Sequence, residues 1–152
     1  MSYKENDDIL YKALLLLNEK LEINNIEKLD LKVCGGYVMY RFTGSMTRDI
    51  DNARTLNKDI KSLISSVFEE LNDFSIEEDW LNDDWEIFQN KTYQSTIVDK
   101  NIKWEKSPDI ALSRLTVTFA ELSSLICMKY FAMIERYKMK DIKWKIEMIC
   151  IN

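Results

Sequence analysis

The clearest hydrophobic pattern in the chain is a helical one that begins at Asn57. Its apolar residues recur at intervals of three and four and form one core-facing stripe: Ile60, Leu63, Ile64, Val67, Phe68 and Leu71. A second helix is expected over residues 6–21, with Asn6 as its N-cap. The apolar spacing predicts two more helices, over residues 121–137 and 140–149.

Short apolar and alternating runs between these helices predict strands. Residues 31–34 form a buried run that stops at Gly35-Gly36, and residues 47–53 alternate with Ile50 directed inward. Further strands are expected at these ranges: 92–98, 102–105 and 114–119. Because strands and helices alternate without an internal repeat, the sequence predicts an α/β (α+β) fold, a small mixed sheet flanked by helices.

Length and composition limit the organisation and the chemistry. The 152 residues suit a single domain, residues 1–152, with residues 121–150 as its C-terminal helical part. The chain has no histidine, and its three cysteines form no CxxC pair, which disfavours a zinc site and a histidine-activated nucleophile. The net charge of −5 argues against wholesale binding of nucleic acid. The N-terminal residues do not form a signal peptide and no apolar run could span a membrane, so a cytoplasmic location is expected.

The most informative segment joins Gly35-Gly36 to Asp49 and Asp51. Adjacent glycines after a strand allow a tight turn and close approach of a ligand, and a helix that starts at Tyr37 would add unpaired N–H groups for phosphate. Asp49 and Asp51 lie two residues apart on a strand, so both carboxylates project from one face, with backbones about 6–7 Å apart. Carboxylates at this spacing can hold the metal ions of in-line phosphoryl transfer. The simpler alternative is a turn and a solvated edge strand in a structural protein.

A cationic stripe is predicted on the C-terminal helix. Lys129, Arg136 and Lys140 are separated by seven and four residues, so on a helix Arg136 and Lys140 lie about 20° to either side of Lys129. Such a stripe either meets a triphosphate, pairs with the aspartates, or is an ordinary solvated face. Trp80 and Trp85 are candidates either for stacking a base or for anchoring the core or a lid.

These motifs together resemble a known family. Gly35-Gly36 followed by Asp49-Ile50-Asp51 is similar to the signature of the DNA polymerase β-like nucleotidyltransferase superfamily. Residues 47–51 resemble the T-R-D-I-D of small bacterial nucleotidyltransferases related to abortive-infection toxins of type IV toxin–antitoxin systems. Residues 79–83 resemble the D-W-L-N-D of one branch, and residues 125–141 its C-terminal helix. The resemblance covers roughly residues 30–145.

The resemblance implies a nucleotidyltransferase fold and a metal-dependent enzyme that moves a nucleotidyl group from a nucleoside triphosphate to an acceptor. Asp49 and Asp51 would hold Mg²⁺ or Mn²⁺. The superfamily commonly adds a third carboxylate, for which Asp83, within a motif, is taken as catalytic, while Asp99 stays an alternative. The residues expected to contact the nucleotide are Gly35, Gly36, Ser45, Thr47, Arg48, Lys129, Arg136 and Lys140.

The acceptor and the retention of catalysis stay open at this point. An RNA end, a protein side chain and a small molecule are all compatible with the motifs, and a toxin role is implied by the resemblance alone. The family helix usually continues K-D-x-x-D, whereas Trp144 stands at the last position here. The alternative function is therefore a catalytically silent module that binds nucleotide or a partner protein, as a regulator or an antitoxin-like subunit.

Overall fold

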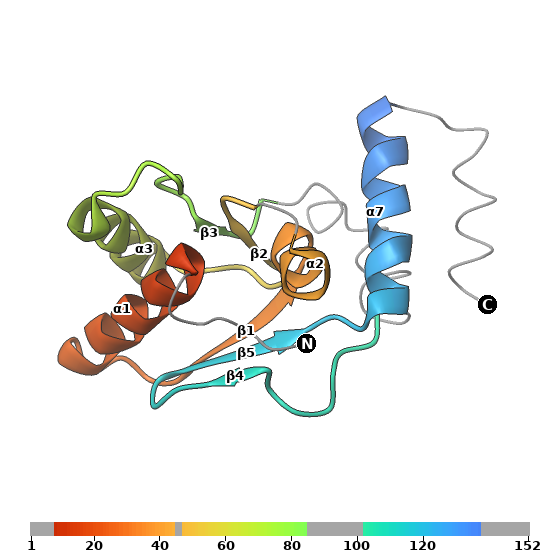
Figure 1. Cartoon of the computed structure of the whole chain (residues 1–152). Coiled ribbons are helices and arrows are strands. Elements are labelled where there is room, and N and C mark those ends of the chain that lie inside the picture. Colours follow the sequence, from red (N-terminus) through yellow and green to blue (C-terminus); the bar gives the residue numbers. More distant parts are fainter. Residues whose placement is uncertain (1–7, 45–46, 85–101, 138–152) are drawn as a thin grey trace.

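The structure is a computed structural model, and it describes residues 8–44, 47–84 and 102–137. A five-stranded mixed sheet in the order β3-β2-β1-β5-β4 forms its centre, and helices pack around it (Figure 1). The predicted α+β class is therefore confirmed for these residues. The predicted strand 92–98 and helix 140–149 lie outside the described residues.

The central strand of the sheet is β1. It pairs in parallel with β5 on one side and antiparallel with β2 on the other, and β2 pairs in parallel with β3. The strands are β1 (Leu29–Cys34), β2 (Ile50–Asn52), β3 (Leu81–Asn82), β4 (Ile110–Ala111) and β5 (Leu115–Phe119). The sequence predicted β1, β2 and β5, with β2 shorter than expected. It did not predict the two-residue edge strands β3 and β4, which are too short to show a period.

The predicted strand 102–105 is wrong. In this segment Trp104 forms only an isolated antiparallel bridge with Ala120. Glu105 N–H donates to the Phe119 carbonyl at 2.9 Å, and Glu121 N–H donates to the Lys103 carbonyl at 2.8 Å. The backbone of this segment is therefore held against the end of β5 without forming a ladder.

Four helices lie in the described part of the chain: α1 (Ile9–Ile23), α2 (Gly36–Thr43), α3 (Lys58–Leu71) and α7 (Leu122–Tyr137). The α3 prediction is confirmed, and its Asn57 cap accepts a hydrogen bond from Ile60 N–H at 2.9 Å. The predicted Asn6 cap is wrong. Helix α1 is capped by the buried Asp8, whose carboxylate accepts from Leu10 N–H at 2.9 Å and from the Tyr37 hydroxyl at 3.0 Å.

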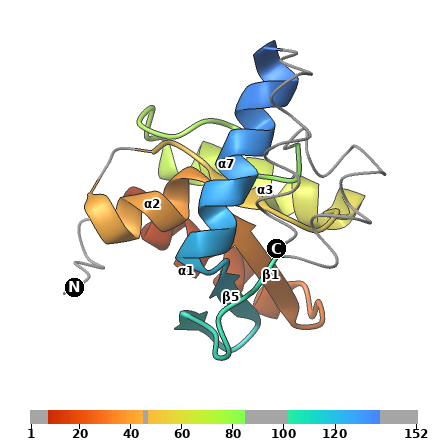
Figure 2. The same cartoon turned by 90° about the vertical axis from the view of Figure 1, so that its right-hand side faces the viewer.

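Helices α1 and α3 pack side by side, and α7 lies on the opposite side of the molecule, as the two views agree (Figures 1 and 2). The leucines of α1 that face inward are Leu10, Leu14, Leu17 and Leu21. They share one hydrophobic core with the stripe of α3, the strands, and Leu125 and Met128 of α7. This core holds the sheet edge that carries β2 and β3 in place.

No helix in residues 8–44, 47–84 and 102–137 is both long enough and apolar enough to cross a membrane.

Truncation of Leu17 tests the packing of α1. Leu17 is fully buried, so Leu17→Ala should lower the free energy of unfolding by about 2–5 kcal/mol, through lost transfer energy and a cavity. Leu15 lies on the same helix but is exposed, so Leu15→Ala should cost less than about 1 kcal/mol. Urea denaturation of both variants measures the difference. Equal losses would contradict the assignment of the buried face.

Candidate functional site

The first glycine of the pair lies directly against Asp51. Cys34, the last residue of β1, pairs with Asp51 of β2, and Gly35 follows with a φ of +75°. A Cβ at Gly35 would lie 2.3 Å from Asp51 Oδ2. Both the positive φ and the contact exclude any other residue without a shift of the carboxylate. The glycine and the aspartate thus belong to one site.

The second glycine lies against the segment that precedes Asp49. A Cβ at Gly36 would lie 2.9 Å from Thr47 Oγ1, and the Thr47 hydroxyl donates to the Asp49 carbonyl at 3.2 Å. Helix α2 begins at Gly36, with Gly35 as its N-cap. The N–H groups of the first turn have no partner within the helix, which makes this end of α2 positive. Because Gly35 contacts Asp51, the positive end of the helix lies close to that carboxylate.

Asp49 and Asp51 flank Ile50, whose side chain is fully buried in the core on the opposite face. Both aspartates are partly buried. Burial, the charge of Asp49 and the nearby Asp84 and Asp79 raise the pKa of Asp51 to about 6. Burial, followed by the charges of Glu77 and Asp79, also raises the pKa of Asp49. The predicted carboxylate pair therefore exists as a site of concentrated negative charge.

Asn82 is the neighbour of this pair on the adjacent strand, and the sequence analysis did not select it. Its Cα is the register partner of Asp51 in the parallel β2–β3 ladder, and its side chain is buried. The amide hydrogen-bonds the carboxylates of both Asp49 and Asp51, which opposes the rise in their pKa caused by burial. Only its place in the motif of residues 79–83 could have indicated it.

Asp83 is not brought to the pair. Successive residues of a strand project to opposite faces, and Asn82 already occupies the position beside Asp51. The Asp83 carboxylate instead accepts from Leu56 N–H at 2.7 Å and lies 3.5 Å from Lys61 Nζ. The geometry gives no support to Asp83 as the third catalytic carboxylate. Within the described ranges, no group of three or more acidic or cysteine side chains is arranged to hold a metal ion.

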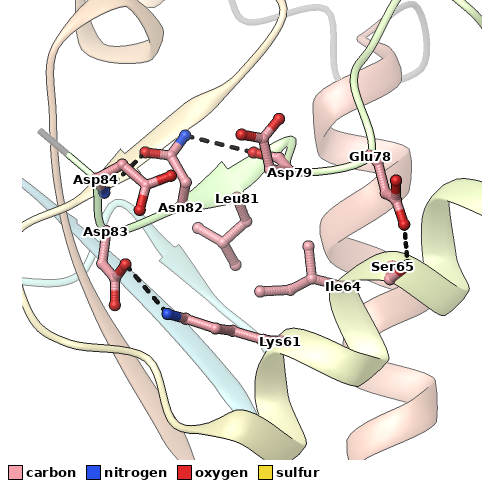
Figure 3. A pocket seen from close by; sticks show the side chains of 9 residues that line it. All are labelled: Lys61, Ile64, Ser65, Glu78, Asp79, Leu81, Asn82, Asp83 and Asp84. Carbon is pink, nitrogen blue, oxygen red and sulfur yellow. Dashed lines mark hydrogen bonds and ion pairs between the residues drawn. The ribbon is translucent and has the colours of Figure 1, made fainter.

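A cavity of about 480 Å³ opens beside this edge of the sheet, between β3 and α3 (Figure 3). Ile64 and Leu81 contribute apolar surface, and Asn82 connects the cavity to the carboxylate pair. Lys61 points across it to Asp83, as Figure 3 shows. The recess therefore reaches Asn82, the register partner of Asp51, while Asp49 and Asp51 themselves are not part of its lining.

The other residues predicted to contact the nucleotide are not among the contacts of Gly35, Gly36, Asp49 and Asp51 described above. Arg48 is exposed, and its guanidinium donates to the carbonyls of Phe74 at 2.8 Å and Ser75 at 3.3 Å. Lys129 and Arg136 lie on α7 at the predicted spacing of seven residues. Ser45, Lys140 and the alternative carboxylate Asp99 lie outside the described residues.

Of the two tryptophans, Trp80 is a core residue. It is fully buried, and its indole N–H donates to the Ile64 carbonyl at 2.9 Å. The interpretation as a core anchor is therefore confirmed for Trp80, and Trp85 lies outside the described residues.

Comparisons with protein-family models, with curated proteins and with solved structures find no match to this chain. The resemblance to nucleotidyltransferases stays a prediction from its motifs.

Two glycines with nearly equal φ separate backbone strain from the close contact. Gly44 has a φ of +74° and open space around it, so Gly44→Ala should lower the free energy of unfolding by about 1–2 kcal/mol. Gly35→Ala should cost about 2 kcal/mol more, because its methyl group also displaces Asp51. Urea denaturation in EDTA measures both. Similar losses for the two variants would show that the contact with Asp51 is not tight.

The raised pKa of Asp51 predicts a pH-dependent stability. The folded state binds the Asp51 proton more tightly than the unfolded chain does. The contribution of this proton to the free energy of unfolding is therefore complete below pH 4 and is lost as the pH rises through about 6. Asp51→Asn removes the ionisation. It should raise the free energy of unfolding at pH 8 by on the order of 2 kcal/mol in EDTA, with a difference that shrinks towards pH 4. Denaturation curves from pH 4 to pH 8 measure the difference in free energy of unfolding between Asp51→Asn and the wild-type protein. A difference that grows towards low pH would contradict the raised pKa of Asp51.

Proposed function

We propose that this protein is a metal-dependent nucleotidyltransferase with the nucleotidyltransferase fold. The observation that carries the proposal is the contact between its two motifs: the Gly35-Gly36 turn closes directly on Asp51 and on Thr47. A structural turn has no need of a half-buried carboxylate at this place. A phosphate-binding turn beside a metal-holding carboxylate does, because Asp51 would hold a cation that neutralises the charge of the bound phosphate.

The chemistry of the residues present fits a magnesium ion. Mg²⁺ prefers oxygen ligands and is commonly held by one or two carboxylates, with water and substrate phosphates completing its shell. Asp49 and Asp51 supply the carboxylates, and the raised pKa of Asp51, due to burial and then to Asp49, reflects a lack of compensating charge that a divalent cation would provide. The metal would polarise the α-phosphate and stabilise the leaving oxygens.

The chain's own residues would orient the substrate. The first turn of α2, from Gly36, would bind phosphate oxygens through its backbone N–H groups, because the missing Cβ atoms allow close approach. Thr47 would fix the position of Asp49 through its hydrogen bond to the Asp49 carbonyl. Lys129, Arg136 and Lys140 would meet the triphosphate from α7 and the segment after it. The recess beside β3 offers room for the acceptor.

The acceptor would be an RNA end, a protein side chain or a small molecule, in a cytoplasmic and toxin-like setting. The second candidate is a catalytically silent module that binds nucleotide or a partner protein. One observation favours it: Asn82, a neutral residue, stands where an acid on β3 would join Asp49 and Asp51.

Transfer of label from α-labelled nucleoside triphosphates, one base at a time, tests the activity. Cell extract serves as the acceptor source, and Mg²⁺ or Mn²⁺ is supplied. Asp51→Asn should lower the rate at least about 100-fold, because a metal ligand is lost. Asp59→Asn removes an exposed carboxylate on α3 and should leave the rate unchanged within about twofold.

Three outcomes separate the candidates. Metal-dependent transfer that is abolished by Asp51→Asn supports the enzyme, and the labelled species gives the acceptor class. Nucleotide binding without transfer would support the silent module. The absence of both would overturn the proposal.

A further inference from the structure

The side chain of Asn82 is held in one orientation by its surroundings. Its Oδ1 accepts a hydrogen bond from Asp84 N–H at 3.1 Å, and its Nδ2 donates to the Asp79 carbonyl at 3.3 Å (Figure 3). A flipped amide would place Oδ1 against the Asp79 carbonyl and Nδ2 against an N–H group, so the network selects the orientation. The amide nitrogen is then the group that reaches the carboxylates of Asp49 and Asp51.

This orientation has a consequence for metal binding. The Asn82 amide lies beside both carboxylates and adds no negative charge there, and its Oδ1 is already engaged by Asp84 N–H. The backbone of β3 could carry an acid at this place, since Asn82 is the register partner of Asp51. Asp83, the next residue, points instead to Lys61. The site is therefore limited to two protein carboxylates in the part of the chain that the structure describes.

From this geometry we infer that Asn82 is a positioning residue that makes metal binding depend on the nucleotide. Two carboxylates alone leave most of the magnesium shell to water, whereas a triphosphate adds further anionic oxygens beside the N-terminus of α2. The cation then binds firmly only as a complex with a polyphosphate. This inference rests on the proposed function for the identity of the site, but it concerns the order of binding rather than catalysis.

The test is Mn²⁺ binding, followed by the paramagnetic resonance signal of free Mn²⁺, with and without a non-hydrolysable nucleoside triphosphate analogue. Mn²⁺ should bind to the wild-type protein with the analogue at least about tenfold more tightly than it binds to the analogue alone. Asn82→Asp adds a third carboxylate and should tighten Mn²⁺ binding without nucleotide about 10–100-fold. It should correspondingly reduce the dependence on the analogue.

Two control variants separate this role from general charge and from packing. Asn57→Asp adds one negative charge at the exposed cap of α3, where Asp caps as well as Asn, and should not change Mn²⁺ binding. Asn82→Ser removes the amide without adding a charge, and should produce no gain in Mn²⁺ binding. A purely structural role of Asn82 would predict the same result for Asn82→Ser and Asn82→Asp.

The inference is overturned if the wild-type protein binds Mn²⁺ equally well with and without the analogue. It is also overturned if a folded Asn82→Asp variant, verified by circular dichroism, gains no affinity. Because the wild-type comparison needs no variant, failure of Asn82→Asp to fold leaves the inference testable. Nucleotide-dependent Mn²⁺ binding without label transfer would refute the enzyme activity but support this inference, so the two failures are distinguishable.

Discussion

The approach of the Gly35 backbone to the Asp51 carboxylate is the constraint on which the site depends. The antiparallel pairing of β1 with β2 sets Cys34 opposite Asp51, so the chain must leave β1 over that carboxylate. Only a residue without a Cβ, at positive φ, can follow that course. The same turn starts α2 and directs its positive end towards the acid. Sheet register, glycine and helix dipole thus act at one point.

The electrostatics of the site reduce the stability of the fold at neutral pH. Within the described residues the ion pairs are Lys20–Glu70 and Lys61–Asp83, and neither includes Asp49 or Asp51. Burial is the main cause that raises the pKa of both aspartates, followed by the charge of Asp49 for Asp51 and by the charges of Glu77 and Asp79 for Asp49. A fold that keeps this cost is expected where the charges serve binding, because a neutral residue would be more stable there. The hydrogen bonds from Asn82 offset only part of it.

The sequence was sufficient for the local features of the site and insufficient for the tertiary ones. The glycine pair and the Asp-Ile-Asp alternation each depend on local backbone geometry, and both are observed where predicted. The register of β3 against β2 is not a local property, because a two-residue strand has no pattern to fix it. The sequence therefore points to Asp83, a carboxylate within the motif of residues 79–83, and gives no reason to select Asn82. The observed cap of α1 is likewise Asp8 and not the expected Asn6, and the second partner of Asp8, Tyr37, lies far away in sequence.

The hydrophobic core decides which residue of β3 meets the carboxylates. Trp80 is fully buried, its indole N–H is bound to the Ile64 carbonyl, and its own carbonyl accepts from Ile50 N–H at 2.6 Å. These contacts set β3 in register with β2 and place Asn82 beside Asp51. A shift by one residue would bring Asp83 to the pair, but it would also withdraw Trp80 from the core, at a cost of several kcal/mol. The packing of one tryptophan thereby determines that the site contains two carboxylates and an amide rather than three carboxylates.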